Sequence, residues 1–146
     1  MKVVVADHVS ADLVAAFARL VSQLSRTAPA PTVDDLQAMV DAPGTSLLLA
    51  VEDADRIVGS LTLAVFRIPT GVRAWIEDVV VDESALRRGV ASALVRHALA
   101  LAAAAGARTV DLTSRPTREA ANLLYAKLGF EQRDTNVWRR ALERAE

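Results

Sequence analysis

The chain has 146 residues, of which 52% are hydrophobic and 24% are charged, and its formal net charge is −1. A near-neutral balance gives no overall attraction to nucleic acid or to a membrane surface, so any anion-binding site must come from a local cluster of cations. The lack of cysteine excludes disulfides, thiolate metal sites and a cysteine nucleophile, and with only His8 and His97 available we expect no metal site.

In chain order, the first half predicts a strand, two capped helices and three further strands. Ser10 is placed to cap the first helix, and Thr32 with Asp35 has the spacing of a capping box at the start of the second. The strands are apolar runs separated by the turn sequences DADR and PTG. The expected elements are a strand at 2–7, helices at 11–26 and 33–40, and strands at 46–52, 57–68 and 72–83.

The second half predicts two helices that flank a strand, followed by a terminal strand pair. The longest helix runs from about Leu86 to Ala105, and Gly106 is well placed to end it. The other helix has Pro116 near its first turn and Gly129 just past its end. The expected elements are helices at 86–105 and 115–129 and strands at 107–114, 130–134 and 137–142.

This order predicts one α/β domain of the α+β type over residues 1–146, with helices covering the faces of a sheet. The longest apolar run, ALALAAAAGA, is too short to span a bilayer, and no secretory leader is visible. We therefore expect a cytoplasmic protein without a membrane or nucleic-acid partner. The abundance of alanine and arginine suggests a bacterial source.

The sequence VDESALRRGVASALV, residues 81–95, places two arginines and a glycine where the longest helix opens. The first N–H groups of a helix have no partner within it and lie at the positive end of its dipole, so they can bind a diphosphate. Gly89 allows close approach to the backbone, and Arg87 and Arg88 supply fork-shaped donors for phosphate oxygens. The alternative is an ordinary helix start with two solvated arginines.

Two motifs in order, LRRGVA at 86–91 and NLLYAKLGF at 122–130, resemble those of the GNAT superfamily of N-acetyltransferases. The resemblance implies a mixed, mostly antiparallel sheet of six to seven strands with splayed middle strands, flanked by about four helices. It also implies acetyl-CoA as co-substrate and direct transfer of the acetyl group, within a ternary complex, to a primary amine of a small molecule or peptide. A homodimer is common in the family.

The resemblance further assigns roles to residues around a cleft between the strands at 72–83 and 107–114. Tyr125 stands where the family commonly places a general acid for the departing thiolate, and a phenol with a reference pKa of about 10 keeps its proton at neutral pH. Backbone and side-chain groups are expected to hold the cofactor. The implied contacts are Val79, Val80, Val81, Arg87, Arg88, Gly89, Val90, Ala91, Ser92, Asn122 and Tyr125.

The attacking amine must lose a proton, and Glu77 and Asp78 are the candidate bases. Neighbouring residues of a strand point to opposite faces, so only one of them faces the acceptor directly, although a β-bulge would shift this parity. Because the resemblance to the family implies a glutamate at this place, we expect Glu77 first and Asp78 second; either carboxylate could instead only pair with an arginine. Leu86 stands where the family usually has Arg or Gln, which leaves open a non-catalytic module that senses acyl-CoA.

Overall fold

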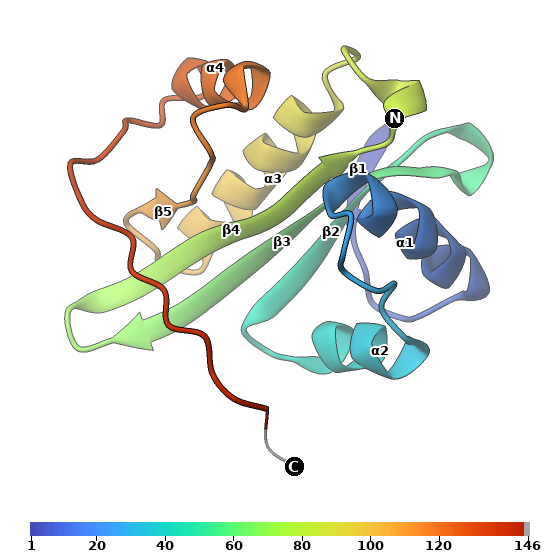
Figure 1. Ribbon diagram of the computed structural model, residues 1–146, viewed down its shortest axis with the longest axis horizontal. Coiled ribbons are helices and arrows are strands. Elements are labelled where there is room, and N and C mark those ends of the chain that lie inside the picture. Colours follow the sequence, from blue (N-terminus) through green and yellow to red (C-terminus); the bar gives the residue numbers. More distant parts are fainter. Residues whose placement is uncertain (145–146) are drawn as a thin grey trace.

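The computed structural model describes residues 1–144 (Figure 1). In those residues it contains five strands, four α-helices and two short 3₁₀ turns. The elements are β1 (Lys2–Val5), α1 (Ala11–Leu24), α2 (Val33–Asp41), β2 (Thr45–Val51), a 3₁₀ turn (Asp53–Asp55), β3 (Ile57–Ile68), β4 (Gly71–Val81), a second 3₁₀ turn (Glu83–Ala85), α3 (Val90–Ala104), β5 (Val110–Asp111) and α4 (Glu119–Lys127).

The strands form one mixed sheet in the order β1-β2-β3-β4-β5, in which β1 to β4 are antiparallel and β5 is parallel to β4. Helices α1 and α2 lie on one face of this sheet, and α3 lies on the other (Figure 1). Each face therefore buries its own core. Leu20 and Leu36 belong to the core under α1 and α2, whereas Leu94 and Tyr125 belong to the core under α3 and α4.

The helix caps expected on the first face are confirmed. The Ser10 hydroxyl accepts a hydrogen bond from the Leu13 N–H at 3.1 Å. In the capping box of α2, the Thr32 hydroxyl accepts from the Asp35 N–H at 3.1 Å and the Asp35 carboxylate accepts from the Thr32 N–H at 2.8 Å. These bonds satisfy backbone donors that a helix start otherwise leaves unpaired.

The close packing of α3 on the sheet depends on a glycine in β3. A Cβ atom on Gly59 of β3 would lie 2.9 Å from Val90 Cγ1 and 3.2 Å from Leu94 Cδ1. Only a residue without a side chain allows the first turn of α3 to pack this closely on the strand. Gly59 thus sets how near the start of α3 comes to the centre of the sheet.

The expected number of six to seven strands is wrong for the described residues, because the sheet has five and residues 130–144 form no strand. In this terminal segment Val137 and Trp138 are adjacent, and their side chains are 75% and 87% exposed. Both residues stay exposed because, within residues 1–144, the terminal segment pairs with no strand of the sheet. β5 is likewise shorter than the expected 107–114, since it pairs only at Val110–Asp111.

Two helices begin later than expected. α3 starts at Val90 rather than near residue 86, because Arg87 and Gly89 have left-handed backbone with φ of 62° and 76°. α4 starts at Glu119 rather than at residue 115. A turn precedes the helix, because the Arg118 N–H donates to the Arg115 carbonyl at 3.0 Å with Pro116 at the second position of the turn, where proline is favoured. Within residues 1–144 no helix has the length and apolar composition needed to cross a membrane.

Candidate acyl-transfer site

A β-bulge in β4 marks the centre of the candidate site. Ser60 of β3 is paired with Val80, whereas Thr62 is paired with Glu77, so β4 holds one extra residue in this interval. Asp78 takes up the extra length with left-handed backbone, φ 48°. The bulge reverses the alternation of faces along the strand. As a result, Val79 packs on the α3 side and Val80 packs on the α1 side.

Beyond the bulge, β4 separates from β5. The two strands pair only at Ala74 with Val110 and at Trp75 with Asp111. A cleft of about 1400 Å³ lies against the part of β4 that follows, and Asp78, Val79, Val80 and Val81 line it. Its other walls are the loop and first turn of α3, residues 113–118, one face of α4, the end of α1 and part of the terminal segment.

The loop before α3 presents backbone N–H groups to this cleft. Within residues 1–144, no N–H from Arg87 to Ser92 donates to another protein group, and the first such donor of the helix is Ala93, which bonds to the Gly89 carbonyl. Gly89 is the N-cap and offers no side chain as a partner. Apart from its chain neighbours, no heavy atom of residues 1–144 lies within 4 Å of the point where its Cβ would stand. The helix start is therefore open to an anion.

Arginine side chains make the cleft locally basic. Arg87, Arg115, Arg118 and Arg139 all line it, whereas Asp78 is the only acidic residue among those that line it in the described part of the chain. The whole chain has a net charge of −1, so this excess of positive charge belongs to the cleft and not to the surface at large. Arginines together with free helix-start amides favour a ligand that carries phosphate groups.

Tyr125 on α4 lies at the inner wall of the cleft and is 9% exposed. Its ring meets Phe130 edge-on, with the ring centres 5.8 Å apart, which fixes the plane of the phenol. Burial raises the pKa of Tyr125 above its ordinary value of 10.0, and the nearby positive charge of Arg118 opposes this rise only in part. The phenol is therefore protonated at neutral pH and can act as a proton donor.

Ser114, just after β5, carries an unsatisfied hydroxyl. It lines the cleft, and within the described residues its Oγ atom is buried and has no hydrogen-bond partner. A buried polar atom without a partner is unfavourable and rare in folded proteins. Its place in the cleft wall suggests that a ligand supplies the missing partner.

Asp82 fixes the start of the loop that leads into α3. The Ser84 N–H, followed by the Arg19 guanidinium and the Ser84 hydroxyl, holds the pKa of Asp82 down at about 2, although burial acts in the opposite direction. Because this pKa lies below the ordinary value of 3.8, the carboxylate stabilises the fold at neutral pH. That contribution is lost only as the pH falls from about 4 towards 2.

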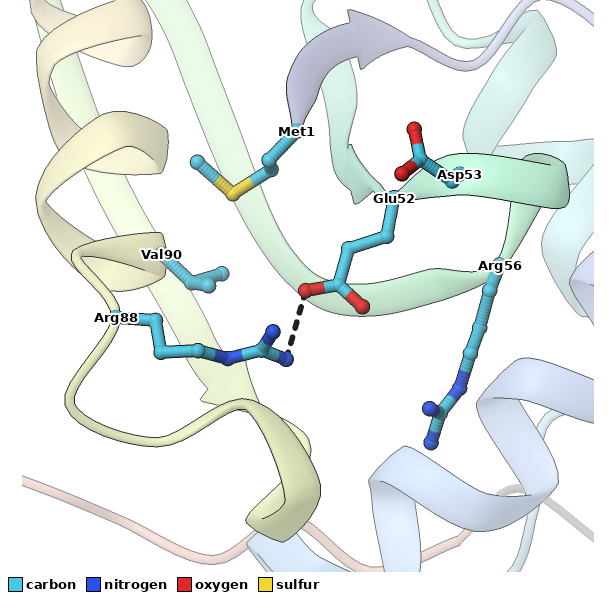
Figure 2. A pocket seen from close by; sticks show the side chains of 6 residues that line it. All are labelled: Met1, Glu52, Asp53, Arg56, Arg88 and Val90. Carbon is cyan, nitrogen blue, oxygen red and sulfur yellow. Dashed lines mark ion pairs between the residues drawn. The ribbon is translucent and has the colours of Figure 1, made fainter.

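Three residues expected at the site lie outside the cleft lining. Glu77 is exposed on β4 but does not line the cleft, whereas Asp78 does. Arg88 turns away from the cleft and pairs with Glu52, with 2.7 Å between Nη2 and Oε1 (Figure 2). Asn122 donates from its amide to the Arg115 carbonyl at 3.0 Å and so supports the loop at 113–118 rather than facing the cleft.

The other expected residues come together. The residues that line the cleft as expected are Val79, Val80, Val81, Arg87, Gly89, Val90, Ala91, Ser92 and Tyr125. Ser114, Arg115 and Arg139 were not expected there from the sequence. The sequence SRPTR at 114–118, with two arginines after a strand, is a signal for Arg115; nothing local marks Arg139, which the terminal segment brings to the cleft.

A sheet in which β4 and the edge strand β5 diverge beside an open helix start, with a protonated phenol at the inner wall, has the architecture of an acyl-transfer enzyme. Residues 13–130 match the acetyltransferase (GNAT) family, and the chain belongs to that family. The family resemblance seen in the two motifs is thus confirmed.

Solved structures give the same result for the fold. A presumed acetyltransferase of Agrobacterium tumefaciens strain C58 is 26% identical, with a TM-score of 0.84 over 97% of this chain and 100% of that one. The aminoglycoside 6'-N-acetyltransferase of Acinetobacter haemolyticus is 18% identical, with a TM-score of 0.77 over 98% and 99%. Glucosamine-6-phosphate N-acetyltransferase of Arabidopsis thaliana is 15% identical, with a TM-score of 0.79 over 96% and 99%. No curated protein sequence matches the chain.

Proposed function

We propose that this protein transfers an acetyl group from acetyl-CoA to a primary amine of a small molecule or peptide. The observation that carries this proposal is the set of unbonded N–H groups from Arg87 to Ser92, which open onto a cleft lined by four arginines. Binding of the CoA diphosphate there is expected to place its pantetheine arm along Val79 to Val81. Within the described residues, the edge of β4 facing β5 has no strand partner at Val79 to Val81, so its backbone can bond to the pantetheine amides.

The chemistry follows from the groups at the inner end of the cleft. The amine nitrogen attacks the thioester carbonyl, a C–N bond forms, and the carbonyl oxygen becomes an oxyanion that a backbone N–H near Val79 can stabilise. The C–S bond then breaks, and the Tyr125 hydroxyl gives its proton to the departing sulfur. The proton lost by the amine passes to Asp78, directly or through water. Of the two candidate bases, Asp78 is preferred here because it lines the cleft.

The choice of acceptors for testing follows from the neighbours in fold. Two of them are named for amino-sugar compounds, an aminoglycoside and glucosamine 6-phosphate. These two amines, together with short peptides that have a free amino terminus, make a reasoned first panel.

The test is a binding measurement followed by an activity measurement. In calorimetry, CoA should bind to the purified protein, and its affinity should fall as salt is raised because the cleft arginines are screened. Release of free thiol from acetyl-CoA should then depend on one of the amines in the panel. A protein that shows no affinity for CoA at low salt would contradict the proposal.

The alternative function is a non-catalytic sensor of acyl-CoA. Leu86, where the family usually has Arg or Gln, is 54% exposed and lines the cleft, so no cation stands at that position. The same pair of measurements separates the two functions. Tight binding of acetyl-CoA without thiol release, for every amine in the panel, favours the sensor.

Replacing Ser114 by alanine should weaken CoA binding by about threefold to tenfold, the value of one hydrogen bond. It should not lower the thermal midpoint of the free protein, because the Oγ atom has no protein partner to lose. Calorimetry and thermal unfolding measure the two effects. Thr113→Val, at the exposed neighbouring position in the cleft, is the matched control. Unchanged CoA affinity in Ser114→Ala would show that the ligand does not reach this hydroxyl.

A further inference from the structure

The loop from Asp82 to Arg88 leads directly into the open helix start, and its first residue is buried. Asp82 is 4% exposed, and its N–H donates to the Val58 carbonyl of β3 at 2.8 Å. Its Oδ1 atom accepts from both the N–H and the hydroxyl of Ser84, at 2.9 and 2.8 Å. Asp82 therefore fixes the first turn of the loop relative to β3.

Helix α1, which is distant in sequence, also contacts this turn. Arg19 Nε lies 2.6 Å from Asp82 Oδ2, a contact between residues 63 positions apart. Arg19 Nη2 also donates to the Ile57 carbonyl at 2.7 Å. One helical turn later, the side chain of Gln23 accepts from the Glu83 N–H at 2.9 Å. Residues 19 and 23 share one face of the helix, so both contacts depend on the position of α1.

The β2–β3 turn also holds the loop, both near its start and at its end. Arg56 Nη2 donates to the Ser84 hydroxyl at 2.8 Å, and Arg88 pairs with Glu52 at 2.7 Å. Figure 2 shows Arg88 reaching from the loop before α3 to Glu52. Both residues line a small pocket that Met1 and Val90 also line. The loop is thus held from two directions while its amides from Arg87 onward stay unbonded.

We propose that Arg19 is a positioning residue for the diphosphate-binding amides, acting through Asp82. The inference rests on the proposed function only in taking a CoA diphosphate as the ligand of those amides. Helix α1 also lines the cleft through Val21 and Leu24. Arg19 therefore holds one wall of the cleft and the anion-binding loop in a single arrangement, ready for the ligand.

Arg19→Gln should raise the dissociation constant for CoA by about tenfold, because the loop then samples positions in which its amides no longer converge. Pantetheine, which lacks the diphosphate, should bind the variant as it binds the unchanged protein. NMR titration measures both affinities. An equal loss for the two ligands, or no loss for CoA, would overturn the positioning role.

Further variants separate positioning from loss of the fold. Arg19→Lys keeps the charge but can reach only one of the two acceptors, so its CoA affinity should lie between those of the unchanged protein and Arg19→Gln. Asp82→Asn should lower CoA affinity about as much as Arg19→Gln, and combining the two should add little, since both remove the contact between Arg19 and Asp82. Arg67→Gln, an exposed charge loss on β3, is the control and should leave CoA affinity unchanged. Fully additive losses would refute action through Asp82.

Hydrogen exchange of the free protein tests the inference without any ligand. In Arg19→Gln, exchange of the hydrogen-bonded amides at residues 82–85 should speed up more than exchange in the sheet core around Leu48 and Leu61, which is fully buried. Uniform acceleration would indicate general destabilisation and count against the proposal. Faster exchange confined to the loop in a protein that nevertheless binds no CoA would support the positioning by Arg19 and reject the proposed ligand instead.

Discussion

Tyr125→Phe should lower kcat by about 10²- to 10⁴-fold, the range that a positioned general acid contributes. The affinity for CoA and the thermal midpoint should change little, because the ring keeps its packing against Phe130 and loses only the hydroxyl. Steady-state kinetics with the best amine of the panel, together with calorimetry, would separate the two parameters. Phe130→Leu is the matched control, since it alters the same ring pair but keeps the phenol.

The pH dependence provides a second check on Tyr125. Burial raises the pKa of this phenol, so its protonated form persists beyond pH 10 and an acid role limits kcat only above that pH. The unchanged enzyme should show no decline in kcat that depends on Tyr125 between pH 7 and 9. The deficit of Tyr125→Phe should therefore be constant across that interval. A variant with undiminished kcat would remove the phenol from the reaction and leave thiolate departure to water.

Sequence patterns predicted the parts of the fold whose signals are local. The caps at Ser10 and Thr32, and the hairpin of β2 and β3, follow from short-range spacing and are present. The terminal strands could not be judged this way, since a strand needs a hydrogen-bonded partner and no local pattern shows whether residues 130–144 find one. The number of strands depends on which segments pair in the folded chain, and local sequence propensities do not give that information.

The part of the site formed by backbone groups could be predicted from the sequence, whereas the part formed by side chains could be predicted less well. Gly89 and its neighbours mark an open helix start by residue type alone. The direction of Arg88 depends on Glu52, which is distant in sequence, and so could not be foreseen. The choice between Glu77 and Asp78 depends on where a bulge falls, and that position follows from the register of β3 against β4.

Asp78→Asn should lower kcat/KM at pH 7 by about 10²-fold, the lower range for loss of a general base, whereas Glu77→Gln should change it by less than about threefold. Asparagine suits this position, because it tolerates the left-handed backbone that Asp78 adopts, so the bulge should persist. The two substitutions each remove one carboxylate from adjacent residues, and they are therefore matched in charge.

The deficit of Asp78→Asn should shrink as the pH is raised towards the pKa of the acceptor amine, about 10 for a lysine-like amine, because more acceptor then arrives already deprotonated. The rate of thiol release from pH 6.5 to 9.5, measured for both variants, gives this comparison. A larger loss in Glu77→Gln would place the acceptor on the α1 and α2 face of β4 instead of in the cleft beside β5. Equal small losses would leave proton removal to water, because neither carboxylate would then be needed to take the proton from the amine.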